Sequence, residues 1–252
     1  IVQRRARQTP SDKIYWRKNK SERDVAVAFL LDMSASTDEE IEERPRSTHL
    51  LDPSPPLHWD RAGGWRWSWD EPPEEPRKRI IDIEKESLVL LIKALETIGD
   101  TYGIYGFSGY GRENVEFFTI KDLDERLSEQ VKRRLDKISP VQGTRMGPAL
   151  RHCVTKLRAV DARLKLLILV SDGRPQDHEY GRDRTEKEYA IHDTRMALLE
   201  AKRHAIVPFC LTVDRFGHDY LKAMCGDIGY EVVSEVAMLP KRLPTLYRRL
   251  TT

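Results

Sequence analysis

Cysteine is scarce in this chain of 252 residues, which has three, at Cys153, Cys210 and Cys225. An odd number of cysteines at wide spacing fits neither a disulfide framework nor a zinc-binding pattern. Cys153 and Cys210 stand among apolar residues, which is typical of small core side chains in a reducing compartment. We therefore expect a cytoplasmic protein without disulfides.

Long apolar runs are also missing. The longest, at residues 25–31 and at 164–170 (broken only by Lys165), have the length of a β-strand, whereas a membrane helix needs about 20 apolar residues. The basic segment that opens the chain is followed by no apolar stretch of the kind that a signal peptide carries. We expect no membrane span. Because the chain starts at Ile1 without an initiator methionine, we also expect a fragment of a longer protein.

Neither sign of charge dominates the chain. Lys and Arg number 43 against 41 Asp and Glu, for a net charge of +2, so the overall charge gives no case for nucleic-acid binding. Residues 1–23 differ, with eight basic residues against two acids. We interpret them as a solvated N-terminal lead-in, with a partner-binding arm as the alternative.

From residue 24 to the end, strand-sized apolar runs alternate with helical patterns. Strands are expected at 24–32, 102–107, 115–120, 164–170, 207–213 and 230–233. Helices are expected at 82–98, 123–138, 149–160, 188–204, 219–225 and 239–250. The turn-rich residues 108–114 join the second and third strands into a hairpin. This order predicts one doubly wound α/β domain over residues 24–252.

Residues 39–79 interrupt that order. They hold seven of the 14 prolines and four of the five tryptophans, and ten acids against seven basic residues, without an apolar period. We expect a long inserted loop with at most short helical turns. Trp65 and Trp67, near arginines, would suit a protein-binding patch. Rings that fold back over the domain's own surface, or a loop disordered in isolation, are the alternatives.

Oxygen-bearing side chains gather where the predicted strands end. Asp32, Ser34 and Ser36 follow the first strand, Asp172 follows the strand at 164–170, and Thr144 lies in a glycine-containing loop between them. Ligands of such sheets bind outside the carboxyl ends of the strands. Each residue alone can cap a helix. Together they form a set of hard oxygen donors, which suits Mg²⁺ or Mn²⁺.

The pattern Asp32-x-Ser34-x-Ser36, then Thr144, then Ser171-Asp172-Gly173 resembles the metal-ion-dependent adhesion site (MIDAS) of von Willebrand factor A (VWA) domains, over about residues 24–250. The resemblance implies a Rossmann-like fold with a mostly parallel six-stranded sheet, one antiparallel edge strand and helices on both faces. It implies that Ser34, Ser36 and Thr144 hold the ion directly, and Asp32 and Asp172 directly or through water. Mg²⁺ is the expected ion, with Mn²⁺ or Ca²⁺ as alternatives. The insertion at 39–79 departs from the family pattern.

Further strings narrow the resemblance. Tyr105-Gly-Phe-Ser-Gly-Tyr-Gly-Arg-Glu-Asn, Thr144-Arg-Met-Gly-Pro and Ser171-Asp-Gly-Arg-Pro-Gln-Asp are similar to the C-terminal A domain of bacterial CbbO and NorD proteins, the Rubisco and nitric oxide reductase activation proteins. This resemblance implies an adaptor that links a hexameric MoxR-type AAA+ ATPase, CbbQ or NorQ, to a client enzyme. An acidic residue of the client would complete the metal site. A CbbO-like adaptor for Rubisco is the expectation, and a NorD-like adaptor is the alternative.

The rival class is a Mg²⁺-dependent phosphotransferase in which Asp32 forms an aspartyl phosphate. Ser34 stands where the haloacid dehalogenase type carries a second aspartate, and the chain has no P-loop motif. We therefore expect a binding domain and not an enzyme. The turn 108–112 should flank the metal edge, because its strand runs parallel to the first strand. Arg112 would then meet a carboxylate of the partner.

Overall fold

The structure is a computed structural model, and it describes residues 24–41, 57–59, 65–67, 78–177, 186–214 and 217–251. Its main sheet has six strands in the order β5-β4-β1-β6-β7-β8. The strands are β1 (Val25–Asp32), β4 (Thr101–Tyr110), β5 (Asn114–Lys121), β6 (Leu164–Ser171), β7 (Ile206–Thr212) and β8 (Gly229–Val232). All pairs are parallel except that of β5 with β4. The predicted doubly wound sheet with one antiparallel edge strand is confirmed.

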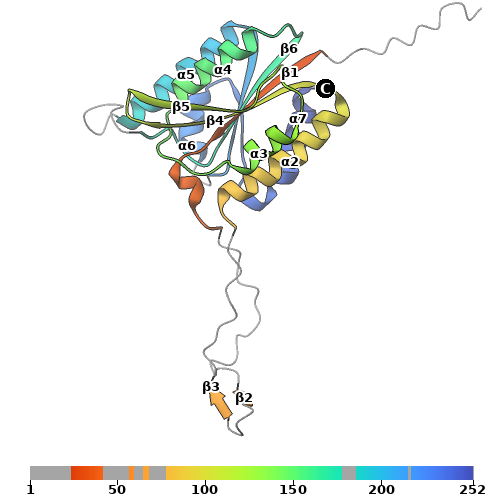
Figure 1. Cartoon of the computed structure of the whole chain (residues 1–252). Helices are drawn as coiled ribbons and strands as arrows, with labels where there is room; N and C mark the ends of the chain where they lie inside the picture. Colours follow the sequence, from red (N-terminus) through yellow and green to blue (C-terminus); the bar gives the residue numbers. More distant parts are fainter. Residues whose placement is uncertain are drawn as a thin grey trace, which may run out of the picture.

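Helices cover both faces of this sheet (Figure 1). They are α2 (Ile80–Ile98), α3 (Glu129–Asp136), α4 (Met146–Arg158), α5 (Glu186–Arg203), α6 (Gly217–Cys225) and α7 (Leu239–Thr251), with short 3₁₀ turns η1 (Ala35–Asp38) and η2 (Val236–Met238). Residues of α2, α3 and α7 share one core, and residues of α4, α5 and α6 share the other. No helix among the described residues has the length and apolar content to cross a membrane.

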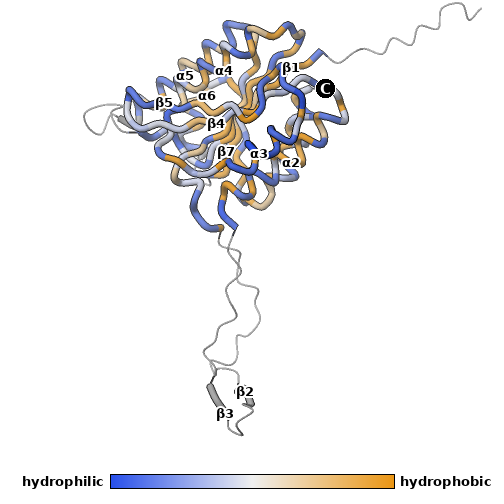
Figure 2. The backbone as a smooth tube through the Cα atoms, viewed as in Figure 1, coloured by the Kyte–Doolittle hydropathy of each residue, from blue (hydrophilic) through white to orange (hydrophobic). Residues whose placement is uncertain are grey.

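The position of strand β1 in the centre of the sheet explains why residues 25–31 are all apolar. All eight of its residues are buried. Val27 and Phe29 belong to the core under α2 and α7, whereas Ala28 and Leu30 belong to the core under α4 and α5. A parallel strand covered on both faces needs an apolar side chain at every position. Figure 2 shows the hydrophobic residues gathered on the central strands.

The register of the sheet brings the strand ends together. Asp32, the last residue of β1, is opposite Phe107 of β4, and Leu31 is opposite Val170 of β6. Because these strands are parallel, the loops that follow them leave from one edge of the sheet. This edge carries the candidate ligands.

One predicted helix is much shorter than expected. The pattern at 123–138 predicts a helix throughout, but α3 begins only at Glu129. Ser128 caps it, because its hydroxyl accepts a hydrogen bond from the Val131 amide at 3.3 Å. The preceding residues are held in a turn, in which Asp122 receives hydrogen bonds from Lys156 and Tyr105. These tertiary bonds outweigh the helical pattern of the segment.

The insertion is pinned at both ends. The Ile41 amide donates to the Lys78 carbonyl at 2.9 Å, and the Ile80 amide donates to the Glu39 carbonyl at 3.1 Å. Arg79 also pairs with Asp38 at 2.9 Å. The insertion therefore leaves and re-enters the domain at adjacent points.

Within the insertion, the structure describes the backbone of two short strands. They are β2 (Leu57–Trp59) and β3 (Trp65–Trp67), which pair antiparallel with Trp59 opposite Trp65. We expected at most helical turns here. Runs of three residues are too short to show an alternating pattern, although β-forming tryptophans flank a Gly-Gly pair in the sequence. The rest of residues 42–77 lies outside the described residues, as do residues 1–23.

Candidate metal and ligand site

Asp32 organises the turn that follows β1. Its side chain is fully buried. One carboxylate oxygen accepts a hydrogen bond from the Ser34 amide at 3.0 Å, and the other accepts one from the Ser171 hydroxyl at 2.8 Å. The Thr37 hydroxyl closes the next turn by donating to the Ser34 carbonyl at 2.7 Å. Asp32 thus ties the ends of β1 and β6 together and fixes the position of Ser34.

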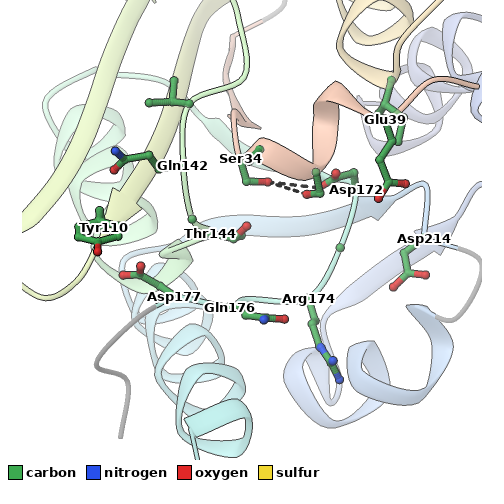
Figure 3. Close-up of a pocket in the computed structure, with 16 residues that line it drawn as sticks. Ser34, Glu39, Tyr110, Gln142, Thr144, Asp172, Arg174, Gln176, Asp177 and Asp214 are labelled. Carbon is green, nitrogen blue, oxygen red and sulfur yellow. Dashed lines mark hydrogen bonds between the residues drawn. The ribbon is translucent and has the colours of Figure 1, made fainter.

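The candidate hydroxyl ligands lie above this turn. The Oγ atoms of Ser34 and Ser36 are 3.0 Å apart, and the Ser34 hydroxyl is 3.5 Å from an Asp172 carboxylate oxygen. Figure 3 shows Ser34 beside Asp172, with Thr144 across the same hollow. These side chains come from the loops after β1 and β6 and from the loop before α4.

A cavity of about 880 Å³ opens at this edge of the sheet. Four of the five predicted ligands line it, namely Ser34, Ser36, Thr144 and Asp172. Asp32 does not line it and lies beneath, hydrogen-bonded to Ser34 and Ser171. The structure therefore brings the five residues together in two layers, and Asp32 supports the layer that faces the cavity.

The electrostatics of the site favour a cation. Burial, and then the charge of Asp172, raises the pKa of Asp32 to about 7, against the opposing effect of its hydrogen bonds. Burial also raises the pKa of Asp172, helped by Glu39 at the cavity wall. Two carboxylates in a poorly solvated space repel each other unless one is protonated or a cation lies between them.

The donor set fits a hard divalent cation. It combines two carboxylates with three hydroxyl groups, all oxygen, with the cavity leaving room for water. In the described residues no group of three or more His, Cys, Asp or Glu side chains is placed to hold a metal. The metal therefore stays a prediction, which rests on the three hydroxyl groups as much as on the two carboxylates.

Sequence reasoning missed a third acid near this site. Glu84 of α2 is 2% exposed, and neither of its carboxylate oxygens receives a hydrogen bond from the described residues. Burial, and then the charges of Asp172 and Asp32, raises its pKa well above its usual range. The signal was present in the sequence, because Glu84 falls on the apolar stripe that also contains Ile81 and Leu88.

The sequence also gave no indication of the buried ion pair that holds the loops of the site together. Arg145 and Asp177 form a buried ion pair, with Nη1 and Oδ2 2.8 Å apart. The other oxygen of Asp177 accepts a hydrogen bond from the Gly111 amide at 3.0 Å. Two backbone bridges, Gly109 with Gly143 and Thr144 with Gln176, join the same three loops. Asp177 thus fixes the loop that carries Thr144 against the turn after β4 and the loop after β6.

Gly143 belongs to this arrangement because no side chain fits at its position. A Cβ atom there would lie 2.9 Å from a carboxylate oxygen of Asp177 and 2.9 Å from the Gly109 carbonyl oxygen. The neighbour of Thr144 must therefore be glycine if the two loops are to approach this closely.

The predicted partner-binding residues have different outcomes. The turn after β4 does flank the cavity, since Tyr110 lines it, and Arg112 is exposed in that turn without lining the cavity itself. For Trp65 and Trp67 the structure describes only the backbone, and their side chains lie outside the described residues. The role of all three residues in binding stays a prediction.

Comparison with known proteins gives sequence relatives over most of the chain. It is 32% identical to Protein NorD of Brucella melitensis over 240 residues, which are 95% of this chain and 32% of that protein. It is 40% identical to an uncharacterized protein of Pseudomonas aeruginosa over 176 residues, 70% of this chain and 28% of that protein. The chain thus spans about a third of the length of these relatives. No family model matches it.

Several solved structures have a fold similar to that of this chain. The PilB minor pilin from Streptococcus sanguinis superposes with a TM-score of 0.62 at 14% identity, over 92% of this chain and 62% of that one. A von Willebrand factor type A protein from Catenulispora acidiphila gives a TM-score of 0.52 at 14% identity, over 91% and 43% of the two chains. At these identities the likeness concerns the fold.

Proposed function

We propose that this chain, which has a VWA-type fold and is similar in sequence to the NorD proteins, is a metal-dependent protein-binding adaptor. It holds Mg²⁺ and links a MoxR-type AAA+ ATPase of the NorQ or CbbQ kind to a client enzyme. The similarity to NorD proteins favours nitric oxide reductase as the client over Rubisco, which we expected first. The ATPase supplies the hydrolysis, and this chain performs no chemistry of its own.

The observation that carries the proposal is the layered donor set. Ser34, Ser36, Thr144 and Asp172 face the cavity and would hold the ion, while Asp32 beneath them would balance its charge and orient Ser34. A bound divalent cation offers a strong electrostatic anchor for an acidic side chain of the partner. Among the described residues, none closes the cavity, which leaves room there for such a group.

The burial of Asp32 argues for a binding role over the phosphotransferase alternative. Its carboxylate does not line the cavity, and both oxygens already accept hydrogen bonds. An aspartate that forms an aspartyl phosphate must reach the phosphorus atom of its substrate. A nucleophile enclosed in this way would need the turn at Ser34 to open first.

Calorimetry with the purified chain tests the metal. Mg²⁺, Mn²⁺ and Ca²⁺ are titrated into the wild type, Thr144→Ala and Asp172→Asn. We expect saturable binding to the wild type and loss of at least one ion's binding in both variants. Asp161→Asn, at an exposed acid away from the site, is the matched control and should bind as the wild type does. Absence of binding to the wild type would refute the proposed site.

Partner binding needs a separate measurement. The immobilised chain is exposed to a NorQ-type hexamer and then to nitric oxide reductase, with Mg²⁺ or with a chelator. Binding that requires Mg²⁺ and is lost in Thr144→Ala supports the adaptor role. Equal binding in the presence of chelator would mean that the partner uses another surface.

A further inference from the structure

Helix α2 is apolar on more sides than the domain core requires. Its residues 88–92 are consecutively apolar. Leu88, Leu91 and Ile92 are buried in the core, but Val89 and Leu90 point away from it and are 39% and 45% exposed. A helix that is apolar all round is normally covered all round. Ile98, near the end of the same helix, is also exposed at 43%.

A groove lies between this outer side of α2 and helix α3, its neighbour in Figure 1. Its volume is about 360 Å³. The apolar part of its lining comes from both helices and from the turn before α3, at Val89, Ile92, Leu127, Val131 and Leu135. No described residue of this chain fills it.

The rim of the groove is positively charged. Three lysines, Lys85, Lys93 and Lys132, line it together with one acid, Asp136. Lys85 donates to the Asp136 main-chain carbonyl at 3.0 Å, which leaves the lysine charge uncompensated by that contact. Lys132 pairs with Glu129, but both side chains are well exposed, so the pair is weak and exchangeable.

We propose that this groove, with Val89 in its apolar lining and Lys93 on its rim, is a docking site for an acidic amphipathic helix of a separate partner protein. An apolar groove between two helices accepts the apolar side of a third helix, which presents side chains every three or four residues. Glutamate and aspartate beside those anchors would meet the lysines of the rim. A second copy of this chain is a poor occupant, because an isologous contact would place the lysine rims against each other.

The groove is distinct from the cavity at the sheet edge. Ile80, the first residue of α2, lines that cavity, whereas the groove begins at Lys85 and extends to Lys93. At 1.5 Å per residue, these positions lie about 7 to 20 Å further along the helix axis. The two surfaces share no lining residue, so a partner at one does not compete for the residues of the other.

A designed peptide serves as the probe. It has 18 residues, leucine at helical spacing on one side, glutamate on the flanks and a fluorescein label. The whole 252-residue chain is titrated into the labelled peptide, and the fluorescence anisotropy of the peptide is measured. We expect saturable binding that weakens about tenfold or more, at least 1.4 kcal/mol, in Val89→Glu and in Lys93→Glu. The second variant changes an exposed side chain and should fold like the wild type.

Two controls define the expected chemistry. Tyr189→Glu places the same charge at another exposed apolar residue, on α5, and should leave the affinity unchanged. A peptide with lysine in place of glutamate should bind much more weakly.

Three outcomes would overturn the proposal. One is no saturable binding of the acidic peptide, or equal binding of the basic one. Another is a dimer in analytical ultracentrifugation that Val89→Glu dissociates, which would make a second copy the occupant. The last is an intramolecular cross-link from a photoreactive residue at position 89, which would show that the chain covers its own groove.

Discussion

Three acids near one edge of the sheet, Asp32, Asp172 and Glu84, all have a pKa that burial raises. Burial disfavours ionisation of each of them. The charge of Asp172 adds to this effect at Asp32 and Glu84, and the charge of Glu39 adds to it at Asp172. Asp32 has hydrogen bonds that partly compensate, whereas Glu84 has none from the described residues. These residues should therefore dominate the pH dependence of the domain.

Glu84 gives the simplest test of this view. Its folded-state pKa is raised, so the stability it contributes is present below about pH 4.5 and is lost as the pH rises through the folded value. Glu84→Gln removes that loss. We expect the variant to gain several degrees in Tm at pH 8 and much less at pH 5, measured by thermal unfolding. The exposed Glu113→Gln is the control; a shift that does not change with pH would contradict the explanation.

The raised pKa of Asp32 links the stability of the domain to both pH and the proposed metal. Without metal, the free energy of unfolding should fall as the pH rises from about 4 to about 7, because the folded state holds the Asp32 proton more tightly than the unfolded state. Saturating Mg²⁺ should raise the Tm at pH 8, by mass action on the folded state. In Asp172→Asn this Mg²⁺ effect should disappear. A Tm that responds equally to Mg²⁺ in both proteins would place the ion elsewhere.

At the scale of elements, the site depends on three loops that are held to one another. The buried pair of Arg145 and Asp177 lies at their meeting point, and the Gly111 amide completes it. Removing one partner of a buried pair leaves the other charge uncompensated. The loops after β4, after β6 and before α4 should thus behave as one unit.

Asp177→Ala tests this unit. We expect a loss of about 3 to 5 kcal/mol in urea unfolding, together with weaker Mg²⁺ binding because Thr144 loses its support. The double variant Arg145→Met with Asp177→Leu should recover part of the stability but not the metal affinity. For comparison, Glu129→Ala breaks an exposed pair with Lys132 and should cost about 0 to 1 kcal/mol. Equal costs for the buried and the exposed pair would refute the role of Asp177.

At the scale of the whole molecule, the two ends of the insertion are tied to each other at the border of the domain. The Ile41 amide donates to the Lys78 carbonyl and the Ile80 amide donates to the Glu39 carbonyl, so the chain leaves and re-enters the domain at adjacent residues. The domain core contains residues that precede the insertion, in β1, and residues that follow it, from α2 onward. Folding therefore does not require the insertion to make a core of its own.

Replacing residues 45–75 by a short Gly/Ser link should leave a folded domain. Loop closure depends weakly on length, and the pinned ends stay in place, so we expect cooperative unfolding with a Tm within a few degrees of the wild type. Metal affinity should be similar. Partner binding should weaken if Trp65 and Trp67 contribute to the interface. Loss of cooperative unfolding would show that the insertion supports the fold.

The α/β architecture and the edge of the sheet at which ligands bind follow from the pattern of strands and helices along the chain. The continuous apolar run at 25–31 indicates burial on two faces. Alternation of strands with helices implies parallel pairing, and parallel strands end on one side of the sheet. Asp32, Ser34 and Ser36 after one strand and Asp172 after its neighbour were therefore expected at one edge. Thr144, which precedes helix α4, was expected there from the order of the motif and the resemblance it implies.

How these residues are layered and supported depends on contacts between loops that are distant in the chain. Periodicity reports which face of an element is buried, but not which side chains from distant loops meet. Arg145 and Asp177 are 32 residues apart, and their contact depends on the closure of two loops. The same holds for Asp32, which lies below the cavity because the Ser34 amide and the Ser171 hydroxyl both converge on it. Such contacts follow from packing in three dimensions, which no local pattern encodes.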